Sequence, residues 1–296
     1  MDPATAPIRA LIIGDEPLTG QCVEIAVEHG IEVVTVATTH ARVRAVGEQL
    51  EIPVVASDGD HVSELHDLVF DVLLSIANLR IVPDALLERA DLALNFHDGP
   101  LPDLVGLNVT SWALLRERPT HAISWHHMSS RVDRGELALV RDFPIGDDDT
   151  AFSLNARCYD AALGSFPEIA RAIVDGDVAR EPQPHRDSTT FLRVDRPGRI
   201  LDPTAMRAIE VDRLVRALDL GGLSANRIGV PLVRVGATWL TAHSSRVLAH
   251  GDAAAGPAAQ REAPGTILQA DGDRLRLRTV DGDVGIAVRT FAGSAV

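Results

Sequence analysis

The amino-acid sequence predicts an α/β protein in which a doubly wound, mostly parallel sheet is followed by a small β-barrel. In the first half, short apolar strand-like runs alternate with helical stretches, which is the pattern of a parallel sheet covered on both faces. In the last third, short β-type runs separated by turns follow one helix. A stretch rich in proline and polar residues separates the two patterns. We therefore expect domains over residues 1–185 and 207–296, joined by a linker over 186–206.

The first domain is predicted from five apolar runs, with helices expected at Gly20–His29 and around Leu86. The runs are Arg9–Ile13, Ile31–Ala37, Val54–Ala56, Phe70–Ile76 and Leu92–Phe96. Ligands of such sheets bind beyond the carboxyl ends of the strands, so the residues after Ile76 and Leu94 are candidate site positions. The turn after the first run, Gly14-Asp15-Glu16-Pro17, lacks a glycine-rich phosphate loop and carries two acids. This argues against a nucleotide-dependent dehydrogenase or kinase.

The second domain is predicted to be an OB-like barrel that follows an amphipathic helix at Ile209–Leu218. Its strand-like runs are Pro231–Val235, Thr238–Ala242, Gly265–Gln269, Leu275–Val280 and Val284–Val288. Asp281-Gly282-Asp283 is a favourable hairpin turn between the last two runs.

Charge and cysteine content restrict the function classes. The formal net charge is −14 and all 28 basic residues are arginine, which argues against a nucleic-acid partner because such proteins neutralise phosphates with basic surface. No apolar run approaches the ~20 residues that span a bilayer. Only Cys22 and Cys158 are present, far apart and without metal-ligand spacing, so we expect no disulfide, no metal site and a cytoplasmic location.

Two polar segments are candidates for chemistry. In Asn95-Phe96-His97-Asp98-Gly99-Pro100-Leu101-Pro102, residues two apart in a strand share a face, so Asn95 and His97 should point into one cleft. An amide can stabilise an oxyanion and an imidazole can move a proton. Asp133, in a loop after the strand-like run Ala122–Met128, could orient that imidazole. From the residues alone, turn or capping roles for Asn95 and His97 and a solvated loop position for Asp133 remain open.

Taken together, these segments resemble the folate-dependent formyltransferases. That family has Asn-x-His-x-Ser-Leu-Leu-Pro, then Arg-Gly, a strand ending in His-x-Met, and Asp-Thr-Gly; here the matching residues are NFHDGPLP, Gly106, WHHM and VDRG. Residues 152–176 resemble the following helix, and Ala263-Pro264-Gly265-Thr266-Ile267 resembles the start of the C-terminal barrel of methionyl-tRNA formyltransferase. The resemblance implies a formyltransferase Rossmann-like first domain.

The resemblance also implies a co-substrate and residue roles. The formyl donor would be 10-formyltetrahydrofolate. His97 would accept the amine's proton and assist departure of the folate nitrogen, Asn95 would bind the oxyanion, and Asp133 would position His97. The folate would lie against backbone in two segments: Leu79, Arg80 and Ile81, and Ser129, Ser130, Arg131 and Val132.

The acceptor is implied less directly. Gly99, Val105 and Arg134 replace the family's serine, arginine and threonine, and Val105 and Arg134 should reshape the acceptor side. The expected acceptor is an amine of a small molecule or of a carrier-tethered intermediate in natural-product biosynthesis. Alternatives are methionyl-tRNA, a sugar nucleotide, water in a 10-formyltetrahydrofolate hydrolase, or no reaction in a binding module. The sequence does not indicate the oligomeric state or whether the chain belongs to a larger multidomain enzyme.

Overall fold

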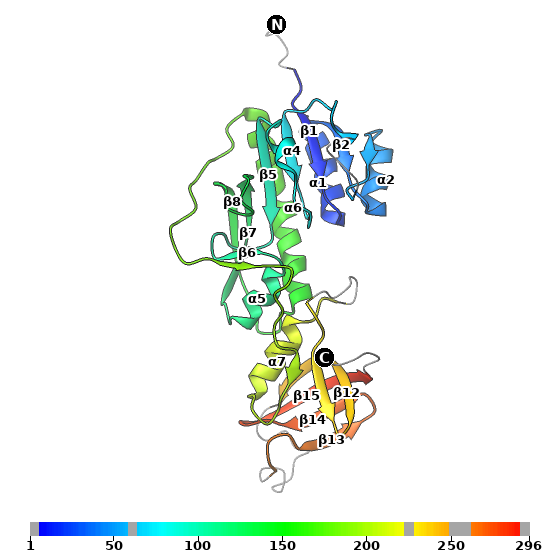
Figure 1. Cartoon of the computed structure of the whole chain (residues 1–296), viewed down its shortest axis with the longest axis vertical. Helices are drawn as coiled ribbons and strands as arrows, with labels where there is room; N and C mark the ends of the chain where they lie inside the picture. Colours follow the sequence, from blue (N-terminus) through cyan, green and yellow to red (C-terminus); the bar gives the residue numbers. More distant parts are fainter. Residues whose placement is uncertain (1–5, 59–63, 222–227, 249–261, 291–296) are drawn as a thin grey trace. The chain divides into compact units, whose positions relative to one another are not determined.

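The chain folds into two compact units, shown in Figure 1. The computed structural model describes residues 6–58, 64–221, 228–248 and 262–290. The first unit comprises Met1–Leu107, Thr120–Pro144 and Ala156–Phe191, and the second comprises Asn108–Pro119, Ile145–Asn155 and Leu192–Val296. The two units are thus interleaved along the sequence, with segments 108–119 and 145–155 counted in the second unit.

A seven-stranded mixed sheet forms the centre of the first unit. Its strands are β1 (Arg9–Ile13), β2 (Glu32–Ala37), β3 (Val54–Val55), β4 (Val72–Ser75), β5 (Leu92–His97), β7 (Thr120–His127) and β8 (Leu137–Pro144). They lie in the order β3-β2-β1-β4-β5-β7-β8. The first five are parallel, as predicted, whereas β7 runs antiparallel to β5 and β8 antiparallel to β7.

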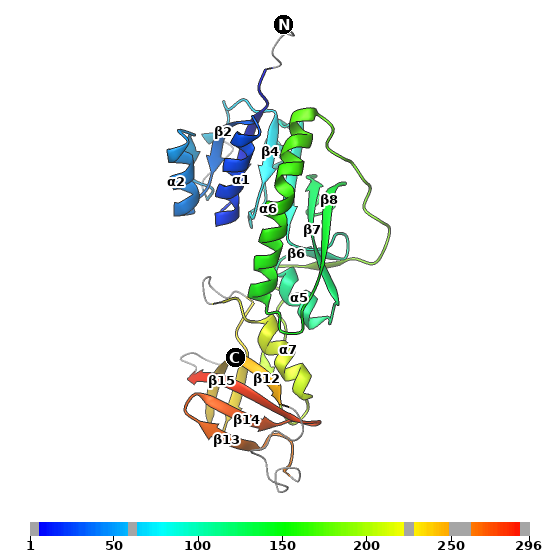
Figure 2. The same ribbon diagram turned by 180° about the vertical axis from the view of Figure 1, so that it is seen from behind.

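Helices cover both faces of this sheet. The helices are α1 (Pro17–Glu28), α2 (Ala41–Gln49), α4 (Asp84–Leu87) and α6 (Ala151–Asp175), and Figure 2 shows α1 and α6 in front of one face. Leu94 and Phe96 of β5 pack on that face with residues of α1 and α6. Because side chains alternate along a strand, Asn95 and His97 are left on the opposite face. The buried apolar residues thus fix which side of the sheet carries the polar pair.

The predicted linker contains two short strands. Thr189–Phe191 forms β9, which pairs in parallel with β6 (Leu104–Gly106), and Ile200–Leu201 forms β10. Neither β6 nor β9 was expected from the sequence, since each has only three residues. Segment 189–191 is therefore an integral part of the first unit.

The second unit is a six-stranded sheet with two helices, α5 (Val109–Leu115) and α7 (Ala208–Ala217). Its further strands are β11 (Leu232–Val235), β12 (Thr238–Leu248), β13 (Ile267–Asp271), β14 (Arg274–Arg278) and β15 (Asp283–Thr290). In the order β10-β11-β12-β15-β14-β13, β10 and β13 are the two edge strands and do not pair with each other among the described residues. The closed OB-like barrel is therefore not confirmed. Across the described parts of both units, no helix is long and apolar enough to cross a membrane.

Candidate active site

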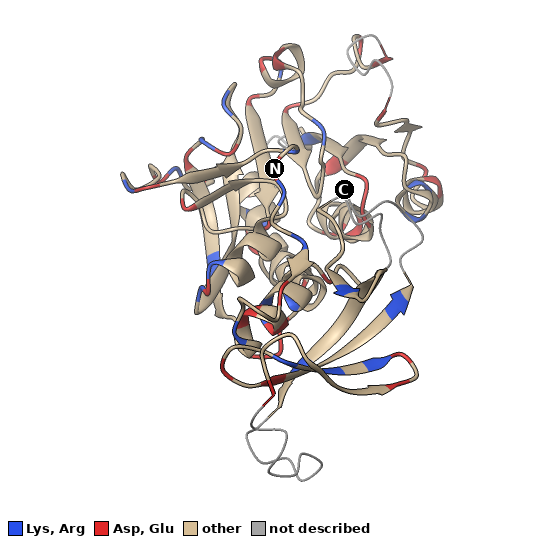
Figure 3. Cartoon of the chain, turned by 60° about the horizontal axis from the view of Figure 1, so that its bottom comes forward, with Lys and Arg blue, Asp and Glu red and all other residues tan. Residues whose placement is uncertain are grey.

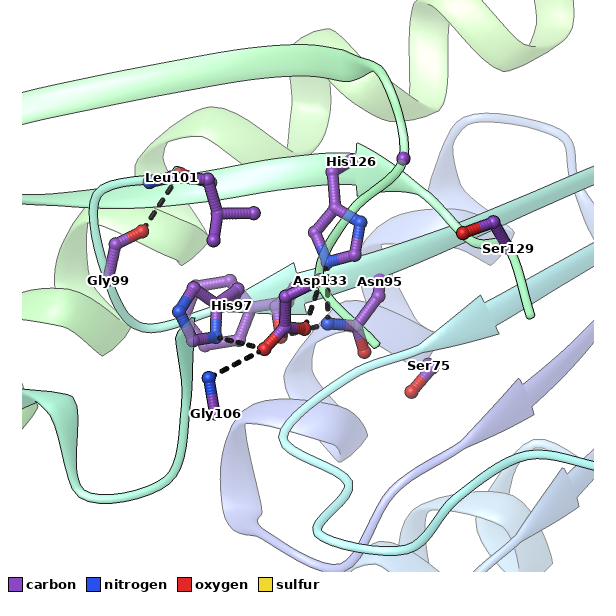
Figure 4. Close-up of polar contacts among 12 residues, drawn as sticks. Ser75, Asn95, His97, Gly99, Leu101, Gly106, His126, Ser129 and Asp133 are labelled. Carbon is purple, nitrogen blue, oxygen red and sulfur yellow. Dashed lines mark hydrogen bonds and ion pairs between the residues drawn. The ribbon is translucent and has the colours of Figure 1, made fainter. Parts of the chain in front are cut away.

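Four polar side chains meet at the carboxyl end of β5, on the face of the sheet opposite α1 and α6. Figure 4 shows Asn95 and His97 from β5, His126 from β7 and Asp133 from the loop that follows β7. In the antiparallel β5–β7 pair, Asn95 lies opposite His126 and His97 lies opposite Ser124. The prediction that Asn95 and His97 share a face is confirmed, and the loop brings Asp133 to the same place.

The His97 ring is buried and held in one tautomer. Its Nε2 lies 2.8 Å from the carbonyl oxygen of Leu104, which can only accept, so Nε2 carries the hydrogen. The other ring nitrogen, Nδ1, therefore has the free lone pair in the neutral ring. This nitrogen lies 3.7 Å from Asp133 Oδ2 and 3.9 Å from Asp98 Oδ1. The basic atom of His97 thus faces two carboxylates.

Asp133 is a buried carboxylate in contact with two imidazoles. Besides His97, its Oδ1 lies 3.4 Å from His126 Nε2, and its Oδ2 accepts a hydrogen bond from the Gly106 N–H at 2.9 Å. Burial raises the pKa of Asp133, but the interactions with His97, His126 and the Gly106 N–H outweigh it and bring the pKa to about 2. Asp133 is consequently ionised at neutral pH.

Gly106 reaches Asp133 because β9 fixes its backbone. Gly106 has φ of +91°, and a Cβ built on it would lie 2.2 Å from the carbonyl oxygen of Phe191. Only glycine combines this positive φ with so close an approach to β9. The next backbone group, the Leu107 N–H, donates to the same Phe191 oxygen at 3.0 Å. The β6–β9 pair thereby aims the Gly106 N–H at Asp133.

Asn95 and His126 form a second hydrogen-bonded pair in the cluster. His126 Nδ1 lies 2.9 Å from the His127 carbonyl oxygen and so carries the hydrogen, leaving Nε2 as an acceptor in the neutral ring. Asn95 Nδ2 lies 3.1 Å from this Nε2 and also donates to the Phe96 carbonyl oxygen at 3.1 Å. His126 therefore orients the Asn95 amide. His127 points elsewhere and contacts the Ala179 carbonyl oxygen.

The first group of predicted folate-binding residues lies in the loop after β4. Leu79 and Ile81 are exposed, with 59% and 81% of their surface accessible. The N–H of Arg80 donates to Asn78 Oδ1 at 2.9 Å, and the Arg80 carbonyl oxygen accepts from Asn78 Nδ2 at 3.1 Å. Asn78, which the sequence did not single out, thus fixes this loop, while the Arg80 guanidinium lies 3.6 Å from Asp15 Oδ2.

The second predicted group lies in the loop between β7 and Asp133. Ser129 Oγ donates to the Arg131 carbonyl oxygen at 3.0 Å and accepts from the Arg131 N–H at 3.3 Å, which closes a tight turn. Ser130 and Val132 are exposed. After Asp133, a Cβ on Gly135 would lie 1.7 Å from the His127 carbonyl oxygen, so this position also requires glycine. Both predicted groups are surface loops, and their assignment to folate stays a prediction.

Two departures from the family pattern have different structural outcomes. Val105 is buried, at 1% exposure, and its effect on the acceptor side stays a prediction. Arg134 donates to Ser188 Oγ at 2.8 Å and to Thr190 Oγ1 at 3.1 Å, both next to or within β9. Arg134 therefore helps to hold β9 beside the cluster. The described residues include no group of three or more His, Cys, Asp or Glu side chains placed to hold a metal ion.

The arrangement suits proton transfer next to an amide donor. It offers a tautomerically fixed imidazole, an ionised carboxylate and an amide within one cluster, which are the parts needed for attack on a carbonyl group. Sequence reasoning did not find the Leu104 carbonyl oxygen, the Gly106 N–H or Asp98 as members of the cluster. The first two are backbone groups. The Leu104 oxygen could come from any residue type, whereas position 106 requires glycine, which the sequence matched to the family's Arg-Gly without indicating a role for its N–H.

The sequence is similar to known formyltransferases. Residues 23–169 match the family profile described as formyl transferase. A methionyl-tRNA formyltransferase from Geobacter sulfurreducens is 25% identical over 195 residues, which cover 60% of this chain but only 62% of that protein.

Two solved structures share the fold over nearly the whole chain. An N-formyltransferase from Helicobacter canadensis, in complex with folinic acid and dTDP-3-aminofucose, has a TM-score of 0.70 at 15% identity, covering 96% of this chain and all of that one. HypX from Aquifex aeolicus in complex with tetrahydrofolic acid has a TM-score of 0.69 at 18% identity, covering 96% of this chain and 44% of that one.

Proposed function

Because this chain belongs to the folate-dependent formyltransferase family, we propose that it transfers a formyl group from 10-formyltetrahydrofolate to a primary amine. The observation that carries the proposal is the cluster itself: His97 Nδ1, its only basic nitrogen, faces the ionised Asp133 at 3.7 Å beside the Asn95 amide. The acceptor amine belongs to a small molecule or a carrier-tethered intermediate, in natural-product biosynthesis.

In the proposed reaction, the amine nitrogen attacks the formyl carbon and the carbonyl electrons move to its oxygen. Asn95 donates a hydrogen bond to this oxyanion; one of its N–H groups turns from His126 or Phe96 to do so. His97 Nδ1 takes a proton from the attacking nitrogen, and Asp133 stabilises the imidazolium that results. Collapse breaks the bond between the formyl carbon and folate N10, which receives the proton from His97. The products are a formamide and tetrahydrofolate.

The folate lies, in this proposal, between the loop with Leu79, Arg80 and Ile81 and the loop from Ser129 to Val132. Both loops are fixed by their own side-chain hydrogen bonds, through Asn78 in one and Ser129 in the other. Their exposed apolar residues, Leu79, Ile81 and Val132, offer surface to a flat aromatic ring. Tetrahydrofolic acid and folinic acid are bound by two of the structures that share this fold.

A sugar-nucleotide acceptor is a second candidate. The structure that contains dTDP-3-aminofucose is matched along its entire length by this chain, which supports an amino sugar linked to a nucleotide as the formyl acceptor. The amine chemistry at His97 would be the same. Only the part of the acceptor away from the amine would differ.

A tRNA acceptor has less support, although the Geobacter relative acts on methionyl-tRNA by its name. Figure 3 shows basic positions dispersed among acidic ones. The arginine-rich strand β14 is partly neutralised, since Arg276 and Arg278 pair with Asp283 at 2.7 and 2.9 Å. The absence of a nucleic-acid partner and a cytoplasmic location stay predictions from the sequence.

The proposal is tested by following the absorbance change as 10-formyltetrahydrofolate becomes tetrahydrofolate. Amines, aminoacyl carriers, sugar nucleotides and charged initiator tRNA are supplied in turn. We expect turnover with one acceptor class, and a His97→Ala loss of about 10²–10⁴-fold in turnover. Turnover without any acceptor would indicate a hydrolase instead. Neither turnover nor folate binding would contradict the proposed function.

A further inference from the structure

Asp98 follows His97, the last residue of β5. Its Oδ1 lies 3.9 Å from His97 Nδ1, on a nitrogen that already faces Asp133 at 3.7 Å. One imidazole nitrogen therefore lies near two carboxylates, although a single carboxylate suffices to orient a histidine. The second carboxylate calls for a separate role.

The backbone of Asp98 is held firmly while its carboxylate is open to a ligand. The Asp98 carbonyl oxygen accepts from His121 Nε2 at 2.8 Å and from Cys158 Sγ at 3.6 Å. Among the described residues, His97 is the side chain paired with the carboxylate itself, and 32% of the Asp98 side chain is accessible. A carboxylate accepts several hydrogen bonds, so Asp98 retains capacity for a donor that enters from solvent.

We propose that Asp98 binds the acceptor amine as its ammonium ion and takes the first proton, so that the enzyme selects a basic primary amine. This inference rests on the proposed formyl transfer and assigns it a further catalytic residue. The need for it is chemical: an aliphatic primary amine is mostly protonated at neutral pH, and an ammonium ion has no lone pair with which to attack a carbonyl carbon.

The proton balance of the proposed step is complete. The ammonium ion gives one proton to the Asp98 carboxylate, which passes it to solvent through the part of the side chain that is accessible. The neutral amine then attacks the formyl carbon, and its second proton goes to His97 Nδ1 and on to folate N10 as the C–N10 bond breaks. The third hydrogen remains on the nitrogen of the formamide. The net reaction consumes an ammonium ion and 10-formyltetrahydrofolate and releases a formamide, tetrahydrofolate and one proton.

The groups around Asp98 favour this proton transfer. Burial raises the pKa of the Asp98 carboxyl, His97 opposes this rise, and the charge of Asp133 adds to it. A carboxylate with a raised pKa is a better proton acceptor for an ammonium ion. Of the other groups that face Asp98, His121 contacts its backbone oxygen, and burial raises the pKa of Cys158 so that it stays a neutral thiol. Asp98 is thus suited to be the first proton acceptor.

The test measures kcat/KM against pH for Asp98→Asn with the primary amine that supports wild-type turnover. At pH 7 we expect a loss of about 10²-fold. The loss should shrink steadily as the pH rises towards the pKa of the amine, because neutral amine then arrives from solution. Asp98→Glu, which restores a carboxylate, should recover part of the activity at pH 7. Asp142→Asn, at an exposed position on β8, is the matched control and should behave as wild type.

Two results would overturn the inference. One is an Asp98→Asn variant with wild-type kcat/KM at pH 7; the other is a loss that is the same at every pH, which would indicate a purely structural effect. Binding of folinic acid, measured by calorimetry, checks that the variant is folded, and if it is not, the pH profile of Asp98→Glu decides. A wild-type protein that transfers no formyl group would instead contradict the proposed function on which the inference rests.

Discussion

Two carboxylates of the first unit, Asp15 and Asp133, lie at different positions along the same sheet and are stabilised in different ways. Asp15 follows β1 in the parallel part, where its oxygens accept from Ser57 Oγ at 2.6 Å and from the N–H and Oγ1 of Thr39 at 2.6 and 2.9 Å. Asp133 follows β7 in the antiparallel part and has one such donor, the Gly106 N–H, together with two imidazoles.

The comparison separates a structural carboxylate from one that can take part in a reaction. The pKa of Asp15 is lowered, because the hydrogen bonds from Ser57, Thr39 and Thr38 outweigh the effect of burial, which raises it. The pKa of Asp133 is lowered mainly by its imidazole neighbours against burial. Hydroxyl and amide donors do not titrate near neutral pH, whereas an imidazole does. A lowered pKa alone therefore does not identify a catalytic carboxylate; the kind of partner does.

After His97→Ala, the largest effect is expected at Asn95, within the cluster that contains Asp133. Asn95→Ala removes the proposed oxyanion donor and should lower turnover by about 10²–10³-fold while the fold is kept. The measurement is folate turnover with the identified acceptor, accompanied by a thermal melt. A variant with wild-type turnover would show that the Asn95 amide is not an oxyanion donor and that it serves only the hydrogen bonds to His126 and Phe96.

A smaller effect is expected in the acid stability conferred by Asp133. Its pKa is about 2 when folded and about 3.9 in an unfolded chain, so its contribution is fully present above pH ~4 and is lost as the pH falls through ~2. The difference in pKa corresponds to about 2–3 kcal/mol in the free energy of unfolding. Urea unfolding from pH 6 to pH 2 should show this loss in the wild type and not in Asp133→Asn. An identical pH dependence in both proteins would rule the contribution out.

The smallest effect is expected at Asp15, and mainly on stability. Asp15→Asn replaces charge-assisted hydrogen bonds by neutral ones and should lower the free energy of unfolding by about 1 kcal/mol. Turnover should change far less than in Asn95→Ala, because Arg80 is the partner of Asp15 in the proposed folate-binding loop, and none of its partners belongs to the cluster of Asn95, His97 and Asp133. A marked fall in kcat in a variant that melts normally would erase the distinction between the two carboxylates.

The residue pattern predicted much of the first unit because its strands are local and regular. The period-two alternation in Leu94-Asn95-Phe96-His97 placed two polar side chains opposite the apolar core, and the structure agrees. Strand β8 was not predicted: its residues, Leu137–Pro144, include exposed charged positions and give no continuous apolar run. The parallel pairing of β6 with β9 joins residues 85 positions apart, Leu104 and Thr189, and short-range patterns do not encode such a pairing.

The candidate site was predictable in its side chains but not in its backbone groups. Asn95, His97 and Asp133 could be singled out by residue type, and their chemical roles remain a prediction. The Leu104 carbonyl oxygen, which selects the His97 tautomer, could belong to any residue. Asp98 had no signal of its own, because an aspartate that precedes a glycine and a proline is also typical of a turn.

The pairing of β9 with β6 also determines how the catalytic region can be cut and recombined. The region that matches the family profile ends at residue 169, yet the strand that fixes the Gly106 N–H comes from residues 189–191. While the chain emerges from the ribosome, Asn95, His97, His126 and Asp133 are made before β9. Until β9 is made, it cannot fix the Gly106 N–H that donates to Asp133. Likewise, a chimaera that exchanges the part of the second unit that follows Phe191 for another module should keep its junction beyond that residue.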